Sequence, residues 1–218
     1  MNKLEIKSRM IEGIPLPMDV SNLEYCNVVS MCIKEPNGMV KVPENLQDLV
    51  NTILPVCISM DDELLWHMRE MYCYLTVKKM YVQPYSSGNR AGLHIDGFLS
   101  DQYNFIWFDS LPTCVSVGDY LLTPDHDISI AEMERQSEEN EYDSLMLDKS
   151  TLYNLTQETV HEVSENYSDN PILRTFIKVT FTRDKWNAIG NAWNYRIPHI
   201  KPDIQRAEGR NHGVLQLH

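Results

Sequence analysis

The stretch that decides the fold is Leu173-Arg174-Thr175-Phe176-Ile177-Lys178-Val179-Thr180-Phe181-Thr182. β-Branched and aromatic residues dominate this stretch, and these residue types favour strands. Successive side chains of a strand point to opposite faces, so one face here carries Arg174, Phe176, Lys178 and Thr180. The other face is apolar apart from Thr175. The sequence therefore predicts a long strand with one apolar face and two cationic side chains on the other.

Other segments with strand-like composition precede this one, each bounded by turn signals, and the last of them includes one or two strands. They cover residues 25–33, 77–85, 103–108, 113–122 and 150–163. Many short strands closed by turns predict a mainly β fold with flanking helices, arranged as a double-sheet β-fold of jelly-roll type.

Local signals within residues 1–75 predict one hairpin and two helices. Asn37-Gly38 predicts a turn from which residues 39–42 return as a strand. Apolar residues at helical spacing predict a helix over 46–54 that stops before Pro55. A longer apolar stripe predicts a helix over 59–74, with Ser59 and Asp62 as its capping pair.

The 218-residue length predicts one domain. We expect N-terminal strands and supporting helices over 1–75, a core over 76–184 and a C-terminal extension over 185–218. Nine acidic residues in 125–148 predict a solvated helix and loop inserted between strands. The extension is expected to wrap its own domain or a second subunit, which would give a homodimer.

Composition limits the function classes. There are 19 Lys and Arg against 31 Asp and Glu, a net charge of −12, which argues against a broad duplex nucleic-acid surface. The same balance favours a neutral or cationic substrate over a polyanion. Five cysteines without a Cys-x-x-Cys motif predict free thiols in a reducing compartment. With no apolar leader and no membrane-length apolar run, the expected location is cytoplasmic.

The segment Gly92-Leu93-His94-Ile95-Asp96-Gly97 carries the strongest chemical signal. On a strand, His94 and Asp96 point to the same side and can share one ion. His161 follows 65 residues later in a β-branched setting. Two histidines and a carboxylate can occupy one face of an octahedral iron and leave the other face open. A structural or surface histidine remains the alternative for His161.

Arg174 follows His161 by 13 residues. A guanidinium on so apolar a strand favours an anionic partner, and a carboxylate accepts its bidentate fork. The alternative is a salt bridge with one of the many acidic side chains. Lys178 is the second candidate anion binder.

The order His94-x-Asp96, then His161, then Arg174 resembles the iron(II)- and 2-oxoglutarate-dependent dioxygenase superfamily. Residues 81–88, which read YVQPYSSG, are similar to the strand and glycine-containing loop before the first ligands in its prolyl-hydroxylase-like branch. The resemblance covers about residues 76–184.

This resemblance implies a double-stranded β-helix core with iron(II) bound by His94, Asp96 and His161. It implies that Arg174 holds the far carboxylate of 2-oxoglutarate and that Tyr81 or Tyr85 adds a hydrogen bond. The interval before Arg174 is longer than is common in the family. Phe176 also stands where serine or threonine is common.

The expected activity is hydroxylation of a C–H bond in an unidentified substrate. The aromatic segment 103–108 supplies candidate walls for the substrate pocket, although such a strand also packs well in a core. Two alternatives keep the site without the oxidation. One is a cupin-like isomerase or hydrolase that holds zinc in the same pocket, and the other is a non-enzymatic binding module.

Overall fold

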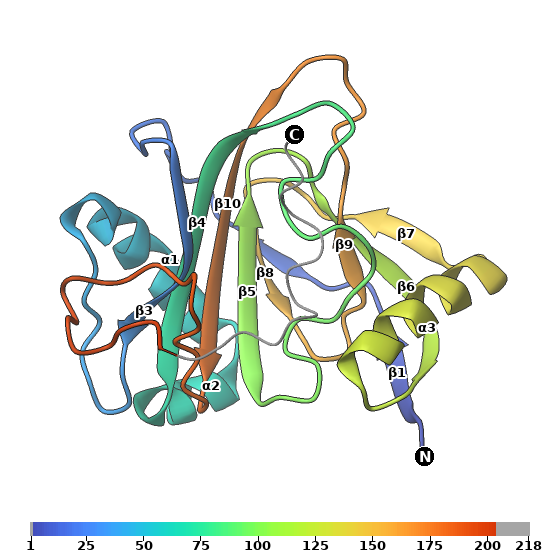
Figure 1. Ribbon diagram of the computed structural model, residues 1–218, viewed down its shortest axis with the longest axis horizontal. Coiled ribbons are helices and arrows are strands. Elements are labelled where there is room, and N and C mark those ends of the chain that lie inside the picture. The colour runs from blue at the N-terminus through green and yellow to red at the C-terminus, as the bar shows by residue number, and fades with distance from the viewer. Residues whose placement is uncertain (1, 204–218) are drawn as a thin grey trace.

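The computed structural model describes residues 2–203, and most of its regular elements are strands (Figure 1). The larger sheet has the strand order β2-β8-β5-β10-β4-β3, and its neighbouring strands are antiparallel. Its strands are β2 (Gly13–Pro15), β3 (Cys26–Lys34), β4 (Tyr72–Val82), β5 (Gln102–Phe108), β8 (Thr151–Leu155) and β10 (Ile172–Thr182).

The smaller sheet has the order β1-β6-β7, and β9 also pairs with β6. Its strands are β1 (Leu4–Ser8), β6 (Thr113–Leu122), β7 (Asp143–Met146) and β9 (His161–Val163). His94 extends this sheet through an isolated bridge to His161, with two backbone N–H···O bonds of 2.9 Å.

From β4 onward the chain passes repeatedly between the two sheets. It runs from β4 in the large sheet to the bridge at His94 in the small one, then back to β5 and across to β6. After β7 it crosses three more times, through β8, β9 and β10. This winding is that of a double-stranded β-helix, or jelly roll, so the expected fold class is confirmed.

The alternation along β10 explains how the large sheet packs. Ile177, Val179 and Phe181 are at most 1% exposed and join a core with the apolar side of α1. The helical elements on this side are η1 (Glu44–Leu46), α1 (Gln47–Ser59), α2 (Asp62–His67) and η2 (Met68–Glu70). The opposite face of β10, which carries Phe176 and Lys178, is left to line the space between the sheets.

The first predicted helix is longer than expected, since α1 continues through Pro55 to Ser59. Proline removes one hydrogen bond from a helix interior and crowds the preceding turn. Pro55 itself is exposed, whereas Cys57 beyond it is fully buried in the core. Burial of the next apolar turn therefore outweighs the local break.

The predicted helix over 59–74 is confirmed only over residues 62–70, as α2 followed by η2. Helix α2 starts after Asp61, whose side chain accepts a hydrogen bond from Leu64 N (2.9 Å), and it ends at His67. Strand β4 begins at Tyr72 and pairs with β10 over eleven residues. Pairing with a distant strand has overridden helical spacing that is only a local signal.

One smaller expectation is wrong and another is confirmed only in part. Gly38 N donates to Glu35 O (2.9 Å) and closes a turn, but residues 39–42 form no strand. In the acidic segment, α3 (His126–Glu139) is the expected helix, capped by Asp125. The same segment also holds β7, a strand of the small sheet, because residues 143–146 pair with β6.

The described part of the C-terminal extension packs against its own chain. Ile197 and Ile200 are buried beside Cys32 and Tyr74. Residues 204–218 lie outside the described part, so the expected homodimer stays a prediction. Within residues 2–203, no helix has the length and apolar character needed to cross a bilayer.

Candidate metal centre

Alternation in the segment before β5 positions the first two site residues. Leu93 and Ile95 are buried in a core between the small sheet and α3, so His94 and Asp96 point the other way. Gly97 ends the segment with φ +72°, a left-handed conformation that glycine adopts without strain. The chain then turns back towards β5.

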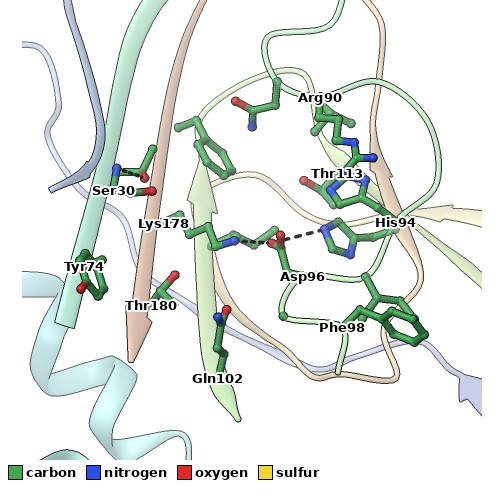
Figure 2. A pocket seen from close by; sticks show the side chains of 18 of the residues that line it. Ser30, Tyr74, Arg90, His94, Asp96, Phe98, Gln102, Thr113, Lys178 and Thr180 are labelled. Carbon is green, nitrogen blue, oxygen red and sulfur yellow. Dashed lines mark hydrogen bonds and ion pairs between the residues drawn. The ribbon is translucent and has the colours of Figure 1, made fainter. Parts of the chain in front are cut away.

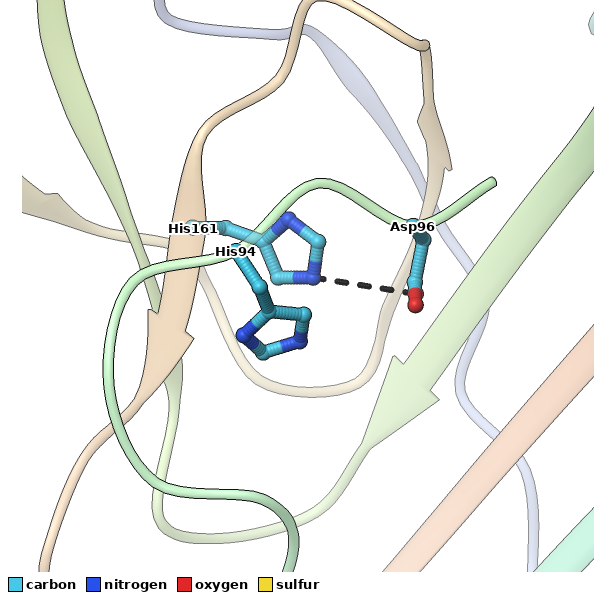
Figure 3. A group of neighbouring side chains, drawn as sticks. All are labelled: His94, Asp96 and His161. Atoms are coloured by element: carbon cyan, nitrogen blue, oxygen red, sulfur yellow. Dashed lines mark ion pairs between the residues drawn. The ribbon is translucent and has the colours of Figure 1, made fainter. Parts of the chain in front are cut away.

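The bridge to β9 brings His161 beside this pair. One possible ligand atom from each of His94, Asp96 and His161 lies within 4.8 Å of the other two (Figure 3). The two imidazole ring centroids are 4.4 Å apart. Residues separated by 65 positions thus converge on one point.

Backbone carbonyls select the tautomer of both imidazoles. His94 Nδ1 lies 2.8 Å from Gly92 O, and His161 Nδ1 lies 2.9 Å from Thr159 O. A carbonyl only accepts, so each Nδ1 carries a proton, and in the neutral form of either ring the lone pair then lies on Nε2. Burial, followed by the neighbouring His161, lowers the pKa of His94 to about 3. His94 is therefore neutral near pH 7, which is the form that binds metal ions.

Lys178 on β10 supplies a counter-charge to Asp96 (Figure 2). Its Nζ lies 2.7 Å from Asp96 Oδ2, and His161 Nε2 lies 3.7 Å from the same oxygen. Burial acts to raise the pKa of Asp96, but Lys178 and His161 outweigh it and hold that pKa well below its ordinary value. The site thus offers two imidazoles and an ionised carboxylate, a donor set that suits iron(II) or zinc(II).

The triad lines a cavity of about 310 Å³ between the two sheets. Tyr74, Thr76 and Lys78 of β4 line it at every second position, as do Phe176, Lys178, Thr180 and Thr182 of β10. Arg90 lies at the wall near His94 (Figure 2). Its Nη1 is 3.3 Å from His126 Nε2. Among residues 2–203, Asp96 is the only carboxylate lining the cavity, against three cationic side chains.

Arg174 does not line this cavity. It is 2% exposed, and its Nε donates to the backbone oxygens of Ser110 (3.1 Å) and Leu111 (3.2 Å). Its guanidinium carbon lies 4.9 Å from the centroid of the Phe176 ring, and Phe176 does line the cavity. Nη2 is buried and has no hydrogen-bond partner among the described residues. Burial lowers the pKa of Arg174 to about 10, and Asp109 acts in the opposite direction.

The two candidate tyrosines lie away from the triad. Tyr81 is 52% exposed and stacks on Tyr25 with ring centroids 5.7 Å apart. Tyr85 is 68% exposed and donates to Asp169 Oδ1 (3.2 Å). Neither lines the cavity. Alternation sends Tyr81 to the face of β4 opposite Lys78, and Tyr85 follows the end of that strand.

The aromatic strand supplies fewer cavity walls than expected. Phe105 and Trp107 are buried in the core that packs on α1, whereas Ile106 between them lines the cavity. Sequence reasoning also missed Lys78 and Arg90. The signal available for Lys78 was its spacing of two and four residues from Thr76 and Tyr74 along one strand.

The fold and the site together define a jelly-roll protein with a candidate two-histidine, one-carboxylate metal centre. No protein-family model matches the sequence, and no curated protein matches it either.

Among solved structures, EvdO2 from Micromonospora carbonacea var. aurantiaca is 13% identical, with a TM-score of 0.42 over 65% of this chain and 67% of that one. A structure of EvdO2 complexed with 2-oxoglutarate is also 13% identical, with a TM-score of 0.38 over 66% and 68%. A nickel complex of the non-heme monooxygenase ThoJ is 12% identical, with a TM-score of 0.38 over 77% and 67%. At such low TM-scores the fold assignment depends on the strand order alone.

Proposed function

We propose that the protein is an iron(II)- and 2-oxoglutarate-dependent oxygenase that hydroxylates a C–H bond of its substrate. The observation that carries the proposal is the convergence of His94, Asp96 and His161 within 4.8 Å, with the Nδ1 atom of each imidazole bonded to a backbone carbonyl. Cationic side chains on the same cavity wall add support, because 2-oxoglutarate is a dianion.

In this proposal His94, Asp96 and His161 hold the iron. Three protein ligands leave coordination positions for the keto acid and oxygen. Bound iron with 2-oxoglutarate supplies the oxidising power for the C–H bond. The carbonyls of Gly92 and Thr159 hold the two imidazoles in orientation, and Lys178 holds the carboxylate of Asp96.

The cavity walls divide into an apolar and a polar part. Ile106, Phe98, Val163 and Phe176 are apolar lining residues that limit water near the metal. Thr76, Thr180 and Thr182 offer hydroxyl groups from β4 and β10, and Gln102 offers an amide. A substrate that presents polar groups to the large sheet suits this second part.

The proposal is tested by reconstituting the protein with iron(II) without oxygen and measuring bound iron per chain. We expect one equivalent in the wild type and far less in His94→Ala and His161→Ala. His67→Ala removes an exposed histidine on α2 and is the matched control. Unchanged iron content in the two site variants would reject the metal centre.

Oxygenase chemistry then requires 2-oxoglutarate. We expect calorimetry on manganese(II)-loaded protein to detect 2-oxoglutarate binding, and the iron form to release succinate once oxygen is admitted. A protein that binds one metal ion but no 2-oxoglutarate would instead fit a cupin-like isomerase or hydrolase.

A further inference from the structure

Lys78 is a cavity cation without an anionic partner. Its Nζ has one hydrogen bond, to Asn89 Oδ1 at 3.0 Å. No carboxylate of residues 2–203 lies within 4.0 Å of it, whereas Lys178 in the same cavity is paired with Asp96. A partly buried ammonium with one neutral acceptor keeps unused donors and an uncompensated charge.

A second cation, with one nitrogen unpartnered, lies close behind it. Lys78 is opposite Phe176 in the β4–β10 register, two residues from Arg174. Arg174 leaves Nη2 unpartnered beneath Phe176. Burial and, next, the charge of Arg174 lower the pKa of Lys78. Two like charges without a carboxylate between them create a positive potential that an anion would relieve.

The register places Lys78 within reach of a ligand held at the metal centre. On the neighbouring strand β10, Phe176 is opposite Lys78, and Lys178 follows Phe176 by two residues. Lys178 contacts Asp96. A rise of about 3.3 Å per residue and a strand spacing of about 4.8 Å put the two lysine Cα atoms roughly 8 Å apart. A five-carbon diacid spans about 5 Å between its carboxylate carbons. The flexible lysine side chains can span the difference between the Cα separation and the length of the diacid.

We infer that Lys78 binds the far carboxylate of 2-oxoglutarate, with Asn89 positioning its ammonium and Arg174 adding positive potential from behind Phe176. The inference rests on the proposed function. It assigns the direct contact with the far carboxylate to Lys78 on β4. Arg174, the residue that the sequence indicated for this contact, lies behind Phe176 and does not line the cavity.

The test compares 2-oxoglutarate with 2-oxobutyrate, which keeps the keto acid and lacks the far carboxylate. Calorimetry on the manganese(II)-loaded protein gives both affinities. In Lys78→Met we expect 2-oxoglutarate to bind at least about tenfold more weakly, because a charge-assisted contact is lost. Binding of 2-oxobutyrate should change less than about twofold, since that ligand never reaches Lys78.

Two further variants make the result specific. Lys78→Arg keeps the charge and should retain most of the preference for 2-oxoglutarate. Lys149→Gln removes an exposed cation that does not line the cavity and should keep the preference. Equal metal content in every variant shows that the centre is intact.

The failures of the two proposals are distinguishable. Absence of metal or of 2-oxoglutarate binding in the wild type would reject the proposed function. Normal binding in the wild type, with an unchanged preference in Lys78→Met, would overturn the role of Lys78 alone. Loss of the preference in Arg174→Met but not in Lys78→Met would return the contact to Arg174.

Discussion

Replacing Lys178 with methionine should change the free energy of unfolding by different amounts in the metal-free and the metal-loaded protein. The ammonium of Lys178 lies 2.7 Å from Asp96 Oδ2, and the two side chains are 21% and 22% exposed. Removing one partner of a fully buried pair costs about 3–5 kcal/mol, whereas exposed pairs contribute about 0–1 kcal/mol. For a pair that is one-fifth exposed, we expect Lys178→Met to lower the free energy of unfolding of the metal-free protein by about 2 kcal/mol.

A divalent ion should remove most of this deficit, because it gives the Asp96 carboxylate a new cationic partner. Metal at 100 times its dissociation constant stabilises a folded protein by about 2.7 kcal/mol. Urea unfolding of wild type and variant, with and without manganese(II), measures both effects. We expect the difference between the two proteins to shrink below about 1 kcal/mol in the metal-loaded state.

The control is Asp96→Asn, which removes the charge that the ion would bind. It should be destabilised without metal and gain little from manganese(II). A Lys178→Met deficit that is the same with and without the ion would show that the metal does not bind at Asp96. Absence of any deficit without metal would show that the observed pair contributes nothing to stability.

Three further substitutions follow from the structure. Pro55→Ala should raise the free energy of unfolding by about 1–2 kcal/mol in urea titrations, because Pro55 is an exposed interior residue of α1. Lys79→Met should lower it by about 2–4 kcal/mol in the same assay, since the Lys79 ammonium donates to three backbone carbonyls in residues 20–23. Gly88→Ala should weaken 2-oxoglutarate binding in calorimetry, because its Cβ would lie 2.9 Å from Val82 Cγ2 and 3.2 Å from Arg174 Nη1. Stability within about 0.5 kcal/mol of wild type for the first two, or unchanged affinity for the third, would contradict these readings.

The strands were predictable where one face is buried and the other is not. Residues 173–182 alternate clearly, and their apolar set does pack on α1. His94 and Asp96 follow the same rule, with Leu93 and Ile95 on the buried side. Alternation depends only on local geometry, so the sequence alone shows which side chains share a face.

The sequence predictions fail where the structure of a segment depends on a partner that is distant in the sequence. Apolar residues in 72–74 continue the helical spacing of the preceding segment. These residues nevertheless form part of β4 and pair with β10, which lies more than a hundred positions away in the sequence. The neighbours Lys78 and Lys79 look equivalent in sequence. In the fold, Lys79 donates to the chain at 20–23 on one face of β4, and Lys78 enters the cavity on the other. Strand parity separates the two lysines, but only the assembled sheets show which face is the cavity.

The charge of the cavity is opposite to that of the whole chain. The net charge of −12 favours a cationic or neutral ligand, but the cavity wall carries Lys78, Arg90 and Lys178 against the single carboxylate of Asp96. Exposed acidic side chains are screened beyond about 8 Å at physiological salt, whereas charges in an enclosed site are screened much less. The local cations therefore contribute more to the potential inside the cavity than the distant surface carboxylates do. An anionic co-substrate is thus compatible with an acidic protein, because the exposed acidic side chains are screened whereas Lys78 lies in the cavity itself.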